Sequence, residues 1–124
     1  MTKEKYLVSA KKVKIPQIKV GDYPRYADIW VVVVDGRVFC RQFTKNKKGW
    51  YAALLQNPEA TLKFDDLEFK ILGKIPADNE ALTGKINKAY IKKYGRSFSW
   101  LAIIAWLMTT KNHSSRTMEL IFNQ

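Results

Sequence analysis

Two apolar runs joined by Asp35-Gly36 dominate the pattern of hydrophobic and polar positions along the chain. The first run, residues 29–34, is rich in β-branched side chains, and the second, residues 37–43, alternates between two faces. Asp-Gly between two such runs is typical of a type I′ turn, because both central residues of that turn need positive φ. The pattern therefore predicts a β-hairpin at the centre of the chain.

The second strand of this hairpin leads into a cluster of cations and hydroxyl groups. Residues 44–49 form a basic, polar loop, and a short helix is predicted over 50–56, ending before Pro58. One face of the strand carries Val38, Cys40 and Gln42, and the other carries Arg37, Phe39, Arg41 and Phe43. Cations and hydroxyls delivered to the start of a helix are suited to binding an anion.

Four further segments have the pattern of strands. Residues 5–20 alternate most clearly after position 12, which predicts a half-buried strand interrupted at Pro16. Strands are also predicted over 60–64 and 67–75, with Asp65-Asp66 as the turn and Gly73 as a candidate bulge, and over 116–122.

The clearest helical pattern runs from Asp78 to Tyr94. Asp78 or Asn79 can cap its start and Gly95 its end, and one apolar stripe comprises Leu82, Ile86, Ala89 and Tyr90. The apolar stretch 99–108 has helical spacing too, which favours a short buried helix over irregular packed chain. The expected fold is a single domain over residues 1–124, mainly β (α+β), with six antiparallel strands and two or three flanking helices.

Composition narrows the cellular context and the partners. The 124 residues carry 22 Lys and Arg against 11 Asp and Glu, a net charge of +11, which favours anionic partners. No signal peptide is recognised at the N-terminus, and the longest apolar stretch, 98–108, is shorter than the roughly 18 residues that a membrane span needs. One cysteine cannot form an intrachain disulfide. We expect a cytoplasmic protein without a membrane segment.

Protein-only catalysis has little support in the sequence. The single histidine, His113, lies in a polar segment without the other members of a nucleophilic triad, and Asp65 and Asp66 are better explained as a turn. One cysteine and one histidine do not fill a metal site, and no phosphate-binding glycine motif occurs. Catalytic residues and a metal site are therefore not assigned.

The central hairpin and the residues after it resemble the flavin-binding split-barrel superfamily, which includes pyridoxamine-phosphate oxidases and deazaflavin-dependent nitroreductase-like proteins. The resemblance rests on a strand, Asp-Gly, a strand ending R-x-F-T-K, and then G-W-Y-x-x-L-L-x-N-P-E-A-T-L, and it extends over roughly residues 27–124. Within the superfamily the chain is most similar to a small family of unknown function with the pattern IWVV, DG, R-S-Y and GWY. The resemblance implies an antiparallel split β-barrel.

The resemblance also implies a cofactor site. In such flavoproteins, cations and hydroxyls near the third strand and the subsequent loop and helix hold the phosphate of FMN or a deazaflavin, and the ring carries the redox chemistry. Trp30 or Trp50 could stack on the ring. The matching positions here are Arg41, Thr44, Lys45, Lys48 and Trp50, while Gln42 stands where relatives have a hydroxyl. Since some members have lost the cofactor, a cofactor-free barrel is equally consistent with the pattern.

Two further interpretations remain open. A non-enzymatic basic module that binds nucleic acid or another acidic partner would use the net positive charge together with exposed aromatic rings. Lysines on one continuous face would favour nucleic acid, whereas cations focused beside Arg41 would favour a phosphorylated cofactor. A homodimer is expected as well, because split barrels usually pair and the stretch 98–108 is more apolar than a small core requires.

Overall fold

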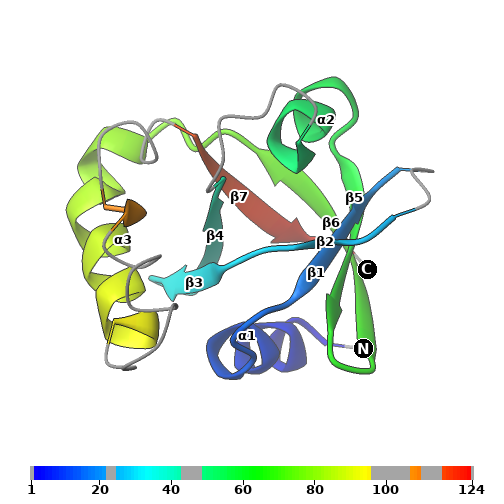
Figure 1. Cartoon of the computed structure of the whole chain (residues 1–124), viewed down its shortest axis with the longest axis horizontal. Helices are drawn as coiled ribbons and strands as arrows, with labels where there is room; N and C mark the ends of the chain where they lie inside the picture. Colours follow the sequence, from blue (N-terminus) through cyan, green and yellow to red (C-terminus); the bar gives the residue numbers. More distant parts are fainter. Residues whose placement is uncertain (1, 22–24, 43–48, 96–106, 110–115, 124) are drawn as a thin grey trace.

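The computed structural model describes residues 2–21, 25–42, 49–95, 107–109 and 116–123. These residues form one seven-stranded antiparallel sheet and three helices (Figure 1). The helices are α1 (Lys3–Lys12), α2 (Trp50–Gln56) and α3 (Asn79–Tyr94). The strands are β1 (Gln17–Val20), β2 (Ala27–Asp28), β3 (Val31–Val34), β4 (Arg37–Arg41), β5 (Glu59–Phe64), β6 (Leu67–Lys74) and β7 (Thr117–Phe122).

The sheet curls into a split barrel. Its strand order is β2-β1-β5-β6-β7-β4-β3, so the two outermost strands are consecutive in the chain and are joined through Ile29-Trp30. A strand was predicted over 29–34; β3 begins only at Val31 and pairs with β4, and the two residues before the predicted run form a separate strand, β2, that pairs with β1. The expected six strands are therefore seven, while the mainly β, antiparallel split barrel is confirmed.

The N-terminal segment is a helix where a strand was predicted. Thr2 caps α1 by accepting a hydrogen bond from the Lys5 amide, and the buried residues Tyr6, Ser9 and Ala10 come after it at helical spacing. The alternation belongs only to the part after α1, where Ile18 and Val20 of β1 are buried. The strand prediction was wrong because it extended this alternation backward over a capped helix.

Both predicted tight turns are present. Asp35 and Gly36 have φ of 53° and 73° between β3 and β4, and Asp65 has φ of 54° between β5 and β6. The predicted bulge at Gly73 was wrong, because β6 pairs with β7 without interruption there. A Cβ at Gly73 would lie 3.0 Å from the Leu54 side chain, so this glycine allows α2 to approach the sheet closely.

The buried side chains form two clusters on opposite faces of the sheet. The barrel core lies inside the curl and is closed by α1; among its members are Tyr6, Ile18, Val31, Cys40, Leu62, Phe64, Phe69 and Ile71. The α3 core lies between α3 and the β3–β4 hairpin, and it comprises Val32, Val34, Phe39, Leu82, Ile86, Tyr90, Tyr94 and Met108. The alternation predicted for β4 is confirmed, since Cys40 belongs to one cluster and Phe39 to the other.

Most of the helix predicted over 99–108 lies outside the described residues. Of that segment only Leu107 and Met108 are described, and Met108 is fully buried in the α3 core. Within the described part of the chain, no helix combines the length and the apolar character that crossing a membrane would require.

Candidate functional site

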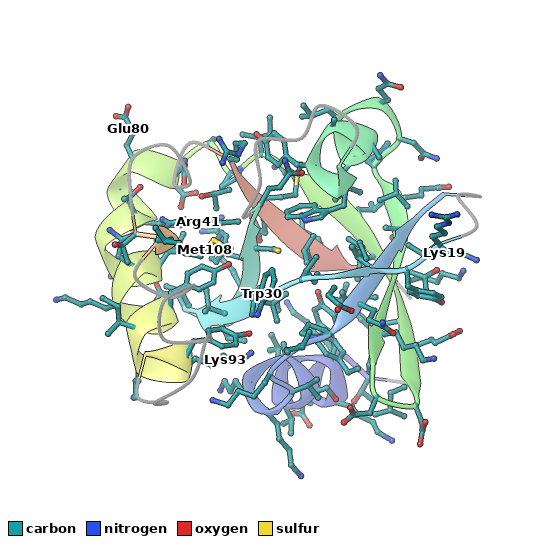
Figure 2. All side chains as sticks on the ribbon, viewed as in Figure 1. Lys19, Trp30, Arg41, Glu80, Lys93 and Met108 are labelled. Atoms are coloured by element: carbon teal, nitrogen blue, oxygen red, sulfur yellow. The ribbon has the colours of Figure 1, made fainter. Side chains whose placement is uncertain are left out.

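Arg41 is the most unusual buried residue of the described chain. It is the last residue of β4, and its relative exposure is 1%, which makes it the largest fully buried side chain. Strand alternation directs it to the same face as Phe39, toward α3. Figure 2 shows Arg41 beside Met108, between β4 and α3.

Two elements, β7 and α3, and the segment around Met108 supply hydrogen-bond partners to this residue. The guanidinium donates from Nε to Thr117 Oγ1 of β7 at 3.0 Å, and from Nη1 to the Met108 carbonyl at 2.7 Å and to Asn87 Oδ1 of α3. The Arg41 amide donates to the Tyr90 hydroxyl at 2.9 Å. The side chain is thus fixed in position by β7, α3 and the segment around Met108.

The charge of Arg41 has no counter-ion among the described residues. Its Nη2 atom is buried without a hydrogen-bond partner there, and none of the ion pairs includes it. Ten of the eleven acidic residues are described, and the sequences of 43–48, 96–106 and 110–115 contain neither Asp nor Glu. Burial lowers the pKa of Arg41, which signifies that its charged form is poorly solvated.

Tyr90 connects Arg41 to Trp30. The Tyr90 hydroxyl accepts from the Arg41 amide and donates to the Trp30 carbonyl at 2.6 Å. Burial raises the pKa of Tyr90 well above its ordinary value, so the hydroxyl stays protonated and keeps donating. Trp30 itself packs against the α3 core. Two of the predicted site residues are therefore linked through Tyr90, Arg41 by its backbone amide and Trp30 by its backbone carbonyl.

Trp50 lies with the other cluster. It begins α2, packs against the barrel core and contacts Tyr51 edge-to-face, with ring centroids 6.0 Å apart. It also lines an apolar pocket of about 240 Å³ between α2 and the β1–β2 pair, together with Ile18, Val20, Arg25, Tyr26, Ala27, Gly49 and Ala53. The structure does not bring Trp50 together with Arg41 and Trp30.

Gln42, at the position where a hydroxyl was expected from the resemblance, makes a structural contact. It is 4% exposed, and its Oε1 accepts a hydrogen bond from the Tyr51 amide at 3.1 Å. Its side chain thus ties the end of β4 to the first turn of α2. Arg41 and Gln42, adjacent in sequence, are directed to α3 and α2 respectively.

The remaining predicted site residues, Thr44, Lys45 and Lys48, and also His113, lie outside the described residues. No group of metal-ligating side chains is present in the described part of the chain. Cys40 is fully buried, and burial raises the pKa of its thiol, so it is not an available thiolate nucleophile.

Sequence reasoning did not identify the residues that surround Arg41. Tyr90 was interpreted as one position of an apolar stripe, although its hydroxyl is the polar link of the site. Asn87 lies three residues earlier and so on the same side of α3, which is a weak signal. For Thr117 and Met108 the sequence gives no signal. Only the pairing of β4 with β7 and the packing of the 107–109 segment bring them to Arg41.

A family model described as an uncharacterized protein conserved in bacteria (DUF2255) matches residues 5–120 of this chain. No curated protein matches the sequence. Among solved structures, the conserved hypothetical protein Rv2991 from Mycobacterium tuberculosis superposes with a TM-score of 0.64 at 14% identity, covering 100% of this chain and 82% of the other. A "putative pyridoxamine 5′-phosphate oxidase" from Listeria innocua gives 0.63 at 12% identity, covering 98% and 94%. These two likenesses concern the fold.

Proposed function

The chain belongs to the bacterial family DUF2255, and from that premise we propose that it binds a flavin-type cofactor, FMN or a deazaflavin, and acts on a small substrate as an oxidoreductase. The proposal is supported by the split-barrel fold, which it shares with a structure described as a pyridoxamine 5′-phosphate oxidase. The observation on which the proposal mainly rests is the buried guanidinium of Arg41. Its Nη2 has no hydrogen-bond partner, and its charge has no counter-ion, among the described residues.

A phosphate group would supply the two things that Arg41 lacks among the described residues, a hydrogen-bond acceptor for Nη2 and a negative charge. A buried charge is costly unless it is paired and hydrogen-bonded, and a phosphate oxygen supplies both the negative charge and an acceptor for Nη2. Since Nε and Nη1 are already bonded to Thr117, Asn87 and Met108, the phosphate would be bound through the N–H donors of Nη2. The contacts to Thr117 and Met108 already hold the side chain, so little conformational entropy is lost on binding.

The roles that we assign derive from this arrangement. Arg41 binds the phosphate, and the cations and hydroxyl of Thr44, Lys45 and Lys48 come shortly after it in the sequence. Trp30, on the same face, is the aromatic residue assigned to the ring. When bound, the flavin ring supplies the hydride chemistry, and the protein positions it and excludes water.

We propose that two copies of the chain share the site. The apolar pocket beside Trp50 has a volume of about 240 Å³, below the roughly 300–1,000 Å³ of ordinary ligand pockets. A second protomer that covers this pocket would enlarge it and would give Trp50 a role at the cofactor after all. Gel filtration of the protein with and without cofactor tests for the dimer.

Titration of the purified protein with FMN and with a deazaflavin, monitored by absorbance and fluorescence, tests the function. We expect Arg41→Met to weaken binding by about 1–3 kcal/mol, as for loss of a charge-assisted hydrogen bond, and Arg41→Lys to recover only part of it. Lys85→Met removes one exposed charge from α3 and serves as the control. Equal affinity of folded Arg41→Met and wild-type protein would remove Arg41 from the site, and no saturable binding would refute the cofactor.

The second candidate function is a basic module that binds nucleic acid or another acidic partner. The net charge of +11 favours it, and exposed lysines lie on α1, β6 and α3. Single-stranded DNA and RNA are therefore included in the titration. Binding that weakens steeply with salt and is insensitive to Arg41→Met would favour this function over the first.

A further inference from the structure

A cavity lined by four lysines lies between α1, β3 and α3. Its volume is about 480 Å³, and the lysines surround a small apolar floor made by Val32, Val33 and Ala89. Lys11 and Lys14 come from α1 and the segment after it, and Lys92 and Lys93 from the last turn of α3. No acidic residue is among the described residues that line it.

Lys93 is the innermost of the four. Its ammonium group donates to the carbonyl of Ala10 in α1 at 2.6 Å and to that of Val31 in β3 at 2.7 Å. An ammonium has three donors, so one N–H remains beyond these two bonds. Figure 2 shows Lys93 near the end of α3 that lies beside α1, at the opposite end of the helix from Glu80.

Lys14 and Lys93 are held close to each other although their charges repel. The Lys14 ammonium lies 5.6 Å from the centroid of the Tyr94 ring, and the Lys93 ammonium lies 5.2 Å from the same centroid. Lys14 also donates to the Lys93 carbonyl, and the Tyr94 hydroxyl donates to the Lys14 carbonyl at 2.7 Å. Structural anchoring explains each lysine alone, but it does not explain why two lysine side chains contact one ring with no carboxylate from the described residues beside them.

We propose that this cavity, the lysine pocket, is a second anion site that binds a compound with two linked phosphate groups, independently of Arg41. Two adjacent phosphates carry enough negative charge to offset several of the four ammonium groups at once, which a single carboxylate does not. The apolar floor of Val32, Val33 and Ala89 would lie against an uncharged part of such a compound.

The lowered pKa of Lys93 is consistent with this geometry, and proton uptake by Lys93 gives a way to measure binding. Burial and the neighbouring Lys14 lower the pKa of Lys93 to about 7. The other titratable groups beside it are Lys11, Lys92, Tyr94 and the buried Cys40 thiol. A bound diphosphate favours the charged amine, so its binding at pH 8 should take up protons and should weaken as the pH rises from 7 to 9.

Calorimetric titration with inorganic pyrophosphate tests the proposal, in two buffers of different ionisation enthalpy at pH 8 so that proton uptake is measured directly. We expect saturable 1:1 binding that Lys14→Met and Lys93→Met each weaken by about tenfold, the loss typical of a charge-assisted hydrogen bond. Lys19→Met removes the same charge from β1, on the far side of the molecule in Figure 2, and should change affinity less than about threefold.

Three further variants, Lys11→Met, Lys92→Met and Arg41→Met, keep the experiment interpretable. If either variant folds poorly, the exposed Lys11→Met and Lys92→Met replace it. Arg41→Met should retain pyrophosphate binding, so failure of the flavin proposal and failure of this one are distinguishable. Equal losses for Lys19→Met and Lys14→Met, binding without proton uptake, or no saturable binding would each overturn the lysine pocket as a specific site.

Discussion

The barrel core and the α3 core are similar in burial but differ in chemistry. The barrel core has two polar side-chain groups among its buried members, the thiol of Cys40 and the hydroxyl of Tyr6, which donates to the Leu120 carbonyl at 2.6 Å, and the buried Gln42, which bonds to α2, is uncharged. The α3 core contains two stacked tyrosines, and it borders the buried Arg41 and the partly buried Lys93. Both cations lie where the sheet faces α3, and neither has a carboxylate partner among the described residues.

This difference suggests a division of roles, in which the barrel core stabilises the fold and the face beneath α3 binds ligands. Aromatic contacts fill the inside of the barrel, where Phe69 is fully buried among Tyr6, Phe64 and Phe122. Buried cations without counter-ions oppose folding, so a protein retains them most readily where they serve a ligand. The cationic face beneath α3 is therefore where ligands are to be sought.

The largest expected effect comes from breaking the barrel core. Phe69→Ala should lower the free energy of unfolding by about 3–5 kcal/mol, because it removes a ring in contact with three other aromatic side chains and leaves a cavity. Urea denaturation measures the loss. Under conditions where this variant stays folded, its affinities for FMN and pyrophosphate should equal those of the wild type, and a selective loss of either would contradict the separation of the two cores.

A smaller loss is expected from Tyr90→Phe in the α3 core. The change leaves the Arg41 amide and the Trp30 carbonyl without their shared partner, which should cost about 1–3 kcal/mol of stability. Tyr51→Phe, which removes a hydroxyl of a half-buried tyrosine, is the control and should change stability by no more than about 0.5 kcal/mol. Equal effects of the two changes would show that the Tyr90 link contributes nothing particular.

Tyr6→Phe sharpens the comparison because only one hydrogen bond is lost, the one that the Tyr6 hydroxyl donates. The variant keeps the ring contacts with Phe64 and Phe69, and it leaves the Leu120 carbonyl unpaired, so we expect a loss of about 1 kcal/mol in urea denaturation. A loss larger than that of Tyr90→Phe would reverse the expected order of the two tyrosines.

The smallest effect at neutral pH is expected for Lys93→Met, because removing a partly buried charge offsets the loss of the bonds to the Ala10 and Val31 carbonyls. The pH dependence of this variant is diagnostic. Since the folded pKa of Lys93, about 7, lies below its ordinary value, the unfolded chain binds more protons above pH 7. The stability of the wild type should therefore gain up to about 1.4 kcal/mol per pH unit from this lysine between pH 7 and 9. Denaturation at pH 6, 7, 8 and 9 should give a flatter profile for Lys93→Met, and parallel profiles would contradict the lowered pKa.

Local signals in the sequence were sufficient for the hairpins and for α2. Asp35-Gly36 determines its turn through backbone conformation, and α2 has the predicted bounds, Trp50–Gln56. The first helix was missed although Thr2 caps it and Lys11 and Lys12 end it, because the alternating residues after it gave the stronger pattern. Competing periodicities of this kind are resolved by tertiary packing, here of Tyr6 and Ala10 on the barrel core.

The candidate site was predictable only in part, because tertiary packing, which local patterns do not encode, determines which residues surround Arg41. Alternation correctly placed Arg41 on the face of Phe39, away from Cys40. The separation of Trp50 from Trp30 depends on how the sheet curls, which no local pattern encodes. Lys93 was interpreted only as a cation at a helix end, and its burial requires α1 and α3 both to pack against β3.

The continuity of β2 and β3 through Ile29-Trp30 has a consequence for behaviour at high concentration. An open sheet offers two edges whose free amides and carbonyls can recruit strands from other molecules. Here both edges are short, two and four residues, and the chain joins them at one corner. Long, flat edges that nucleate fibrils are thereby avoided in the described sheet, so the barrel resists edge-to-edge aggregation by its connectivity, without proline or inward-pointing charges in either edge strand.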